Sequence, residues 1–113
     1  MKYRRIAIVA PALALCLGAA VPAHADGDPV AGRKKAIRCQ NCHGLDGLSK
    51  LPEAPNLAGQ NMTYMIKQLG EFAAGVRKDP MMSLVAATLT PGDIADLTAY
   101  YSSIEITVAP PAH

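Results

Sequence analysis

Cys39-Gln40-Asn41-Cys42-His43 is the stretch that decides how this chain folds. Two residues separate its cysteines and a histidine follows the second one directly, which is the C-x-x-C-H pattern of covalent haem attachment. The spacing lets both thiols reach the two vinyl groups of one porphyrin and places the histidine under the iron. The motif therefore predicts one haem c, held by thioethers to Cys39 and Cys42 and ligated by His43.

Three other roles are open to a C-x-x-C pair. A thiol oxidoreductase carries the pair at a helix start after a strand, whereas a basic helical stretch precedes Cys39 here. A structural zinc site requires four ligands, and residues 26–113 offer only the two cysteines, His43 and His113. A disulfide forms readily in an oxidising compartment, but it leaves His43 without a role. Haem attachment explains more of the motif than any of these.

The first 25 residues have the features of an export signal. Three basic residues precede an apolar run over residues 6–21, which ends in Ala23-His24-Ala25. We expect a secretory signal peptide, cleaved after Ala25 to release the protein into the periplasm. An uncleaved membrane anchor is the alternative. It is disfavoured because the run contains Pro11 and Gly18 and falls short of the roughly 18 apolar residues that a spanning helix needs.

The remaining residues, 26–113, form one expected domain with eight basic and nine acidic residues, a formal charge of −1. This balance gives no electrostatic basis for binding nucleic acid, and no membrane span is expected after signal cleavage. A domain of this size buries little apolar surface and usually needs a staple. Because it has no tryptophan and a single phenylalanine, we expect the haem to fill its core.

Helix signals divide the domain into three helical segments. A basic helix is expected to run up to Arg38, with Asp28 as its N-cap and Pro29 in its first turn. A second is expected over residues 62–74 with Asn61 as its cap, and a third starts after Thr90 and stops near Ser103. In the third, Ile94, Leu97, Thr98 and Tyr101 share one face.

The segments between these helices carry turn residues. Residues 44–60 are rich in Gly, Pro, Asn and Ser and are expected to form a loop. Residues 76–89 are interpreted as a second irregular segment, and the tail over residues 104–113 as extended. No strand pattern is visible, so the fold class is all-α, with Ala36 of the first helix packing on Leu97 and Tyr100 or Tyr101 of the last.

Over residues 32–103 the chain resembles the class I c-type cytochromes of bacteria, found alone or in tandem in periplasmic electron carriers. The resemblance rests on the haem motif, on Pro55-Asn56-Leu57-Ala58-Gly59-Gln60, on residues 75–82 and on residues 89–101. It implies a small fold of three to four helices around one covalently attached haem. It also implies an electron carrier and not an enzyme, since iron closed on both faces leaves no position for a substrate.

The resemblance also implies a methionine as the second iron ligand. Met81 and Met82 lie in the irregular segment where the family places it, and Met82 is favoured by its spacing to Leu89. Met62 and Met65 lie in an expected helix and suit the core better. By the same resemblance, the Pro55 carbonyl accepts the Nδ1 hydrogen of His43. Tyr64 and Arg77 are candidates to contact the haem propionates, and roles on the solvent-facing surface are the alternative.

Two settings for electron transfer remain open. In one, the protein is a free periplasmic shuttle between a redox donor and an acceptor. In the other, it is the cytochrome subunit of a periplasmic oxidoreductase complex with a flavin, molybdenum or quinone dehydrogenase. A basic cluster before the haem motif, formed by Arg33, Lys34, Lys35 and Arg38, is a candidate for steering an acidic partner; a solvated helix face is the alternative.

Overall fold

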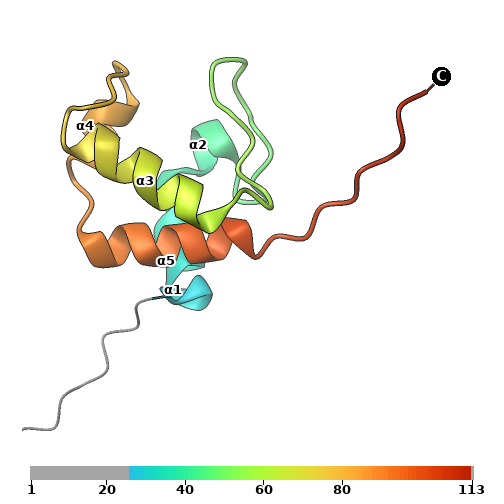
Figure 1. Cartoon of the computed structure of the whole chain (residues 1–113), viewed down its shortest axis with the longest axis horizontal. Coiled ribbons are helices and arrows are strands. Elements are labelled where there is room, and N and C mark those ends of the chain that lie inside the picture. Colours follow the sequence, from blue (N-terminus) through green and yellow to red (C-terminus); the bar gives the residue numbers. More distant parts are fainter. Residues whose placement is uncertain (1–25, 113) are drawn as a thin grey trace, which may run out of the picture.

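The computed structural model describes residues 26–112; the expected signal peptide, its cleavage site and His113 lie outside them. Its elements are α1 (Pro29–Lys35), the 3-10 helix η1 (Ala36–Arg38), α2 (Gln40–His43), α3 (Met62–Ala73), α4 (Met82–Ala86) and α5 (Pro91–Ser102). No strand occurs within residues 26–112, which confirms the all-α fold class. Helix α5 packs against both α1 and α3, and α3 packs against α4 (Figure 1).

Side-chain caps fix where the three expected helices begin. The Asp28 carboxylate accepts the amide of Val30 at the start of α1. The Asn61 side chain accepts the amide of Tyr64 at the start of α3. At α5, Thr90 and Asp93 form a capping box, in which each side chain accepts the backbone amide of the other residue. These contacts confirm the three predicted caps. The caps could be predicted because capping depends on neighbouring residues alone.

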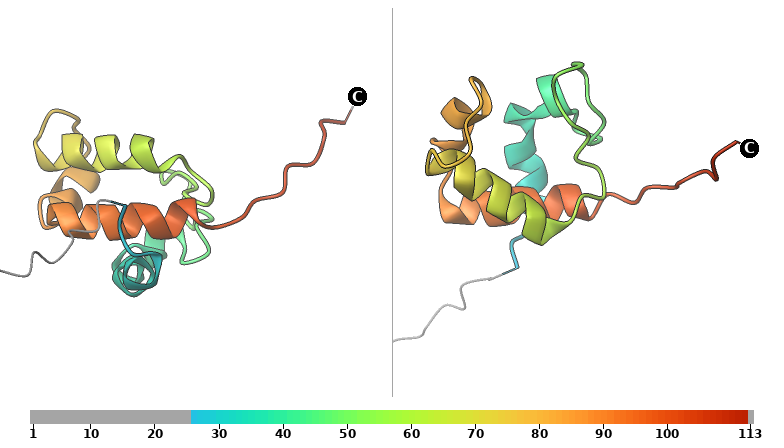
Figure 2. Two further views of the ribbon diagram at one scale, coloured as in Figure 1. Left: turned by 60° about the horizontal axis from the view of Figure 1, so that its bottom comes forward. Right: turned by 45° about the horizontal axis from the view of Figure 1, so that its top comes forward.

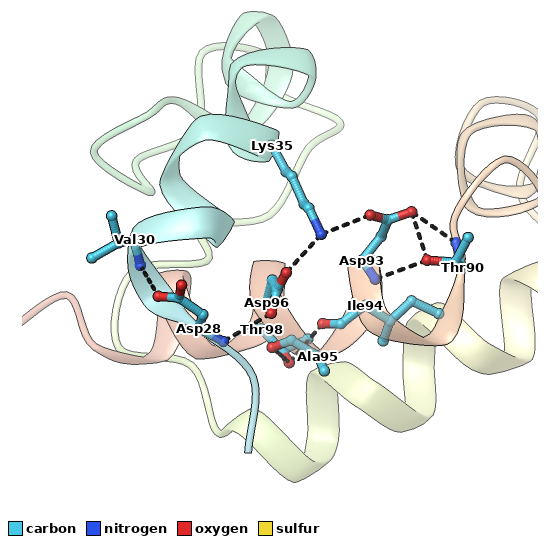
Figure 3. A network of polar contacts seen from close by, with 9 residues as sticks. All are labelled: Asp28, Val30, Lys35, Thr90, Asp93, Ile94, Ala95, Asp96 and Thr98. Atoms are coloured by element: carbon cyan, nitrogen blue, oxygen red, sulfur yellow. Dashed lines mark hydrogen bonds and ion pairs between the residues drawn. The ribbon is translucent and has the colours of Figure 1, made fainter. Parts of the chain in front are cut away.

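Polar contacts connect α1 to α5 (Figure 3). The Lys35 ammonium lies 2.8 Å from a carboxylate oxygen of Asp93 and 2.6 Å from one of Asp96. The other Asp96 oxygen accepts the backbone amide of Asp28 at 2.8 Å. The α1 end of the chain is thus tied to the first two turns of α5, and Lys35 is not free to meet a partner.

The buried core lies where α5 meets α1, η1 and α3. It consists of Ala36, Met65, Leu97 and Tyr101, which confirms the predicted packing of Ala36 on the last helix. The crossing is close because Gly32 lies against α5: a Cβ on Gly32 would stand 1.9 Å from the Asp96 carbonyl oxygen. In the left view of Figure 2, α1 and η1 are seen nearly end-on beside α5, so the helices cross steeply.

The structure differs from the sequence predictions in two short helices. Residues 82–86, expected to be irregular, form α4, and residues 40–43 of the haem motif form α2. Both are too short for an apolar periodicity to show in the sequence. Residues 105–112 are exposed and extended, and this tail leaves the helices in all three views (Figures 1 and 2). Within residues 26–112, no helix has both the length and the apolar character to cross a membrane.

Candidate functional site

A cavity of about 730 Å³ opens between α2 and α4, with α3 and α5 forming further walls. In Figure 1, α2 and α4 lie on opposite sides, above the pair formed by α3 and α5, and the right view of Figure 2 agrees. Its volume falls in the usual range of small-molecule and cofactor sites. The lining includes Cys39, Cys42, His43, Pro55, Leu57, Tyr64, Met65, Gln68, Leu69, Phe72, Arg77, Met81, Met82, Val85, Leu89, Leu97 and Tyr101.

The haem motif occupies one wall of this cavity. Cys39 lies between η1 and α2, and Cys42 lies in α2, so one turn of chain presents both half-buried thiols to the same space. Burial raises the pKa of the Cys39 thiol, an effect that Arg38 opposes and Cys42 reinforces. Both cysteines line the cavity together with His43.

His43 is buried, with 7 % of its surface exposed. Its Nδ1 lies 2.9 Å from the carbonyl oxygen of Pro55, the contact expected from the sequence. With Nδ1–H donating to that oxygen, Nε2 keeps its lone pair and is available to a metal. The chain turns sharply after His43 at Gly44, which has a φ of +72°, and a Cβ there would lie 2.2 Å from Asp46 Oδ1.

Two neighbouring tyrosines of α5 hold the loop that follows His43. The Tyr101 hydroxyl donates to the Gly44 carbonyl at 3.1 Å, and the Tyr100 hydroxyl donates to the Leu45 carbonyl at 2.6 Å. Burial raises the pKa of the Tyr101 phenol above its ordinary value of 10.0, and the nearby Cys39 adds to the effect. The phenol is therefore neutral and able to donate at any physiological pH. The two hydrogen bonds attach the histidine wall, the side of the cavity formed by His43 and the loop after it, to helix α5.

Met81 and Met82 both line the opposite side of the cavity, at the start of α4. Met81 is 61 % exposed, whereas Met82 is half-buried. The carboxylate of Asp79 accepts the amides of Met82 at 2.8 Å and of Met81 at 2.9 Å. These two amides, in that order, lower the pKa of Asp79, with Arg77 adding a smaller effect, so its carboxylate is ionised at neutral pH.

Tyr64 and Arg77, the expected propionate contacts, both lie at the cavity. Tyr64 is 49 % exposed. The guanidinium of Arg77 stacks 4.5 Å from the centre of the Phe72 ring and donates to Gln68. Arg77 therefore has protein partners already, and Gln68, which the sequence reasoning did not single out, joins it in the lining.

The residues present fit a covalently attached haem. Two thiols, one histidine with a free Nε2 and a thioether sulfur surround one largely apolar cavity. This set of donors is the one that c-type haem uses. Within residues 26–112, no group of three or more His, Cys, Asp and Glu side chains is arranged to hold a metal ion by itself.

Asp79, Tyr100 and Tyr101 were not among the site residues predicted from the sequence. An Asp-Pro pair followed by a serine four residues after the aspartate is a local signal of a capped turn, and it was available in Asp79, Pro80 and Ser83. The partners in the two tyrosine contacts are separated by 55 and 57 positions in the chain. Only the fold brings them together.

The comparisons with known proteins agree with this site. The family model described as cytochrome c matches residues 30–105. Cytochrome c4 of Pseudomonas aeruginosa is 42 % identical over 96 residues, which cover 85 % of this chain and 48 % of that protein. Cytochrome c-554(548) of Halomonas halodenitrificans is 43 % identical over 82 residues, which cover 70 % of this chain and 99 % of that protein.

A solved structure also matches the fold. The crystal structure of reduced recombinant cytochrome c4 from Pseudomonas stutzeri aligns with a TM-score of 0.66 and 38 % sequence identity, over 73 % of this chain and 48 % of that one. The chain thus spans about half the length of its cytochrome c4 relatives and the alignment covers nearly all of cytochrome c-554(548).

Proposed function

The chain belongs to the cytochrome c family, and we propose that it works as a periplasmic electron carrier with a single haem c. One observation carries the proposal: both thiols of the haem motif, His43 and a methionine pair line the same cavity. When bound, the haem supplies an iron that changes between Fe(II) and Fe(III). His43 and a methionine of the pair would hold that iron, which would leave it to exchange electrons without binding a substrate.

The proposed iron ligands are His43 Nε2 and the sulfur of Met82. The Pro55 carbonyl, 2.9 Å from Nδ1, orients the imidazole and increases its basicity. Met82 is favoured over Met81 because it is half-buried at the cavity, while Met81 is 61 % exposed. A neutral thioether favours the ferrous state, so this ligand set raises the reduction potential.

Two alanine variants of the holoprotein test the assignment. Met82→Ala is expected to abolish the charge-transfer band between methionine sulfur and ferric iron and to lower the midpoint potential. Met81→Ala is the matched control and is expected to change neither, because Met81 is 61 % exposed and Met82 is the proposed ligand. The reverse pattern would move the ligand role to Met81, and an intact band in both variants would contradict methionine ligation by this pair.

Export is part of the proposal and rests on residues 1–25. Thioether formation on a C-x-x-C-H motif, a signal-like N-terminus and membership of the cytochrome c family support a periplasmic location. Amino-terminal sequencing of the red protein from a periplasmic extract tests the cleavage site. Asp26 as the first residue is the expected result, and an intact Met1 would contradict it.

The basic cluster before the haem motif is the proposed docking site for an acidic redox partner. Arg33, Lys34 and Arg38 are exposed, and Arg38 also lines the haem cavity, whereas Lys35 is held by Asp93 and Asp96. Lys34→Glu is therefore the informative charge reversal, because it leaves the contact between α1 and α5 intact. Lys34→Glu is expected to slow electron exchange with the partner and to make the rate of that exchange depend less on salt concentration. Unchanged rates at low salt would contradict this role.

A second candidate function is the electron-accepting subunit of a periplasmic oxidoreductase complex containing a flavin, molybdenum or quinone dehydrogenase. The observation in its favour is a relative named thiosulfate dehydrogenase electron acceptor, from Stutzerimonas stutzeri, which is 34 % identical over 76 residues. Gel filtration of a native periplasmic extract, followed through haem absorbance, discriminates between the two. A lone small red protein supports the shuttle, and elution together with a larger catalytic chain supports the complex.

A further inference from the structure

We propose that Asp79 is a positioning residue for the methionine side of the haem site: its carboxylate fixes the backbone of Met81 and Met82, which holds the Met82 sulfur on the iron against competing ligands. The inference rests on the proposed function, because it requires Met82 to ligate the iron. It concerns a residue that touches neither the haem motif nor the histidine wall.

Four hydrogen bonds enclose the five residues from Asp79 to Ser83. One Asp79 carboxylate oxygen accepts the amides of Met82 at 2.8 Å and Met81 at 2.9 Å. In return, the Asp79 amide donates to the Ser83 hydroxyl oxygen at 3.0 Å, and the Ser83 amide donates to the Asp79 carbonyl at 3.1 Å. Pro80, inside this ring of contacts, has a fixed φ. The backbone that carries Met82 thus has little freedom.

Packing within the protein restrains this region only after Met82, where α4 lies against α3 and Ala86 is fully buried. Before Met82, residues 73–81 are all exposed, and Arg77, Asp79, Pro80 and Met81 among them line the cavity. Upstream, the amides of Val76 and Arg77 donate to the Glu71 carbonyl, which fixes the segment only at its beginning. The Asp79 contacts are the restraint next to the ligand itself.

A restraint of this kind matters because a thioether is a weak, neutral ligand for ferric iron. Fixing the two methionine amides before the sulfur binds lowers the conformational entropy that ligation must overcome. Without the carboxylate both amides turn to water, and the methionine competes less well with an added ligand. Contacts around metal ligands typically change affinity by 10–100-fold when they are removed.

The chain offers a matched control in Asp46. Its carboxylate also accepts the amide two residues on, that of Leu48 at 3.0 Å, and it pairs with Lys50 at 2.9 Å. Asp46 lies in the loop after the haem motif and does not line the cavity. Replacing it removes the same kind of turn contact without touching the methionine segment.

The test uses the ferric holoprotein and imidazole as the competing ligand. Asp79→Ala is expected to bind imidazole roughly tenfold more tightly than the wild type, with a weaker charge-transfer band and a lower midpoint potential. Asp79→Asn, whose amide oxygen still accepts the two N–H groups, is expected to remain near the wild type. Asp46→Ala is expected to match the wild type in all three measurements.

The measurements distinguish failure of this inference from failure of the proposed function. If the wild-type protein has the charge-transfer band and Asp79→Ala changes neither the band nor the imidazole affinity, the inference alone is overturned. A wild-type ferric protein without the band would overturn methionine ligation and this inference together. If Asp79→Ala does not fold, Ser83→Ala takes its place: it removes one contact of the ring and is expected to raise imidazole affinity about threefold, and no change would overturn the inference.

Discussion

At the scale of single residues, the phenol of Tyr101 connects the haem motif to the fold. Its side chain is 2 % exposed and its hydroxyl donates to the Gly44 carbonyl, directly after His43. Tyr100 makes a similar contact to Leu45 from a half-buried position. The two bonds make the position of His43 depend on α5, so changes at the end of α5 are expected to reach the iron site.

Replacing Tyr101 by phenylalanine tests this connection. We expect a loss of about 1–2 kcal/mol in the free energy of unfolding, because the carbonyl of Gly44 loses a buried donor. Urea denaturation of the holoprotein measures it. Tyr100→Phe is the comparison and is expected to cost less, since its hydroxyl lies nearer the solvent. An equal cost for both variants would show that burial of the Tyr101 hydroxyl adds nothing.

The pKa of Tyr101 gives the same residue a pH signature. Because its pKa is raised in the folded protein above the ordinary value of 10.0, the unfolded chain releases that proton at lower pH than the folded one. The contribution to stability is complete below pH 10 and declines as the pH rises beyond it. Unfolding measured from about pH 8 to 11 should show a smaller alkaline decline in Tyr101→Phe than in the wild type. Identical slopes would contradict the assignment.

At the scale of helices, the close crossing of α1 and α5 depends on a missing side chain. A Cβ on Gly32 would lie 1.9 Å from the Asp96 carbonyl oxygen and 2.8 Å from the Tyr100 Cβ. Gly32→Ala must therefore separate the helices, at a cost of about 2–3 kcal/mol. Gly70 of α3 has no atom within 4 Å of its virtual Cβ, so Gly70→Ala should stabilise by roughly 0.5–1 kcal/mol. Thermal unfolding of the two variants, with shifts of opposite sign, checks this.

The contacts of Lys35 add a charge-dependent part to the same crossing. Hydrogen bonding to Lys35 lowers the pKa of Asp96 and, together with the Thr90 contacts, that of Asp93; the two carboxylates raise the pKa of Lys35. The carboxylate contribution is complete above their ordinary pKa of 3.8 and is lost as the pH falls below it. The Lys35 contribution is complete below its ordinary pKa of 10.5 and is lost as the pH rises through its raised value.

Asp96→Asn tests the ion pair while keeping an oxygen for the Asp28 amide. We expect the melting temperature near neutral pH to fall by roughly 5 °C. As the pH is lowered, the melting temperature of the variant should decrease less steeply than that of the wild type. Because the pair is partly exposed, the difference should shrink at high salt. A melting temperature that does not depend on the substitution at low salt would show that the ion pair does not stabilise the crossing.

The same elements show what the sequence could predict. The caps at Asp28, Asn61 and Thr90 were predictable because each is a contact between residues at most three positions apart. Helix α4 was missed because five residues give no apolar period. The contact between Lys35 and Asp96 spans 61 positions, so the local sequence pattern could not predict it. In the site, the haem motif named Cys39, Cys42 and His43, while the residues that hold them come from distant parts of the chain.

At the scale of the whole molecule, the haem is expected to be part of the core. The central buried cluster of residues 26–112 consists of Ala36, Met65, Leu97 and Tyr101, and the last three also line the cavity of about 730 Å³. A domain of this size buries little apolar surface by itself. The haem would add apolar contacts to this core, so folding and haem attachment are expected to be linked.

The last prediction concerns that linkage. A Cys39→Ala/Cys42→Ala variant, which cannot form thioethers, should lack cooperative thermal unfolding when purified without haem, and its helical circular dichroism should be well below that of the holoprotein. Added haem that binds through His43 should restore part of both, because ligand binding to the folded state alone stabilises it. The single variants Cys39→Ala and Cys42→Ala, each with one thioether left, should be intermediate. Cooperative unfolding of the haem-free double variant at native helicity would show that the side chains alone fill the core.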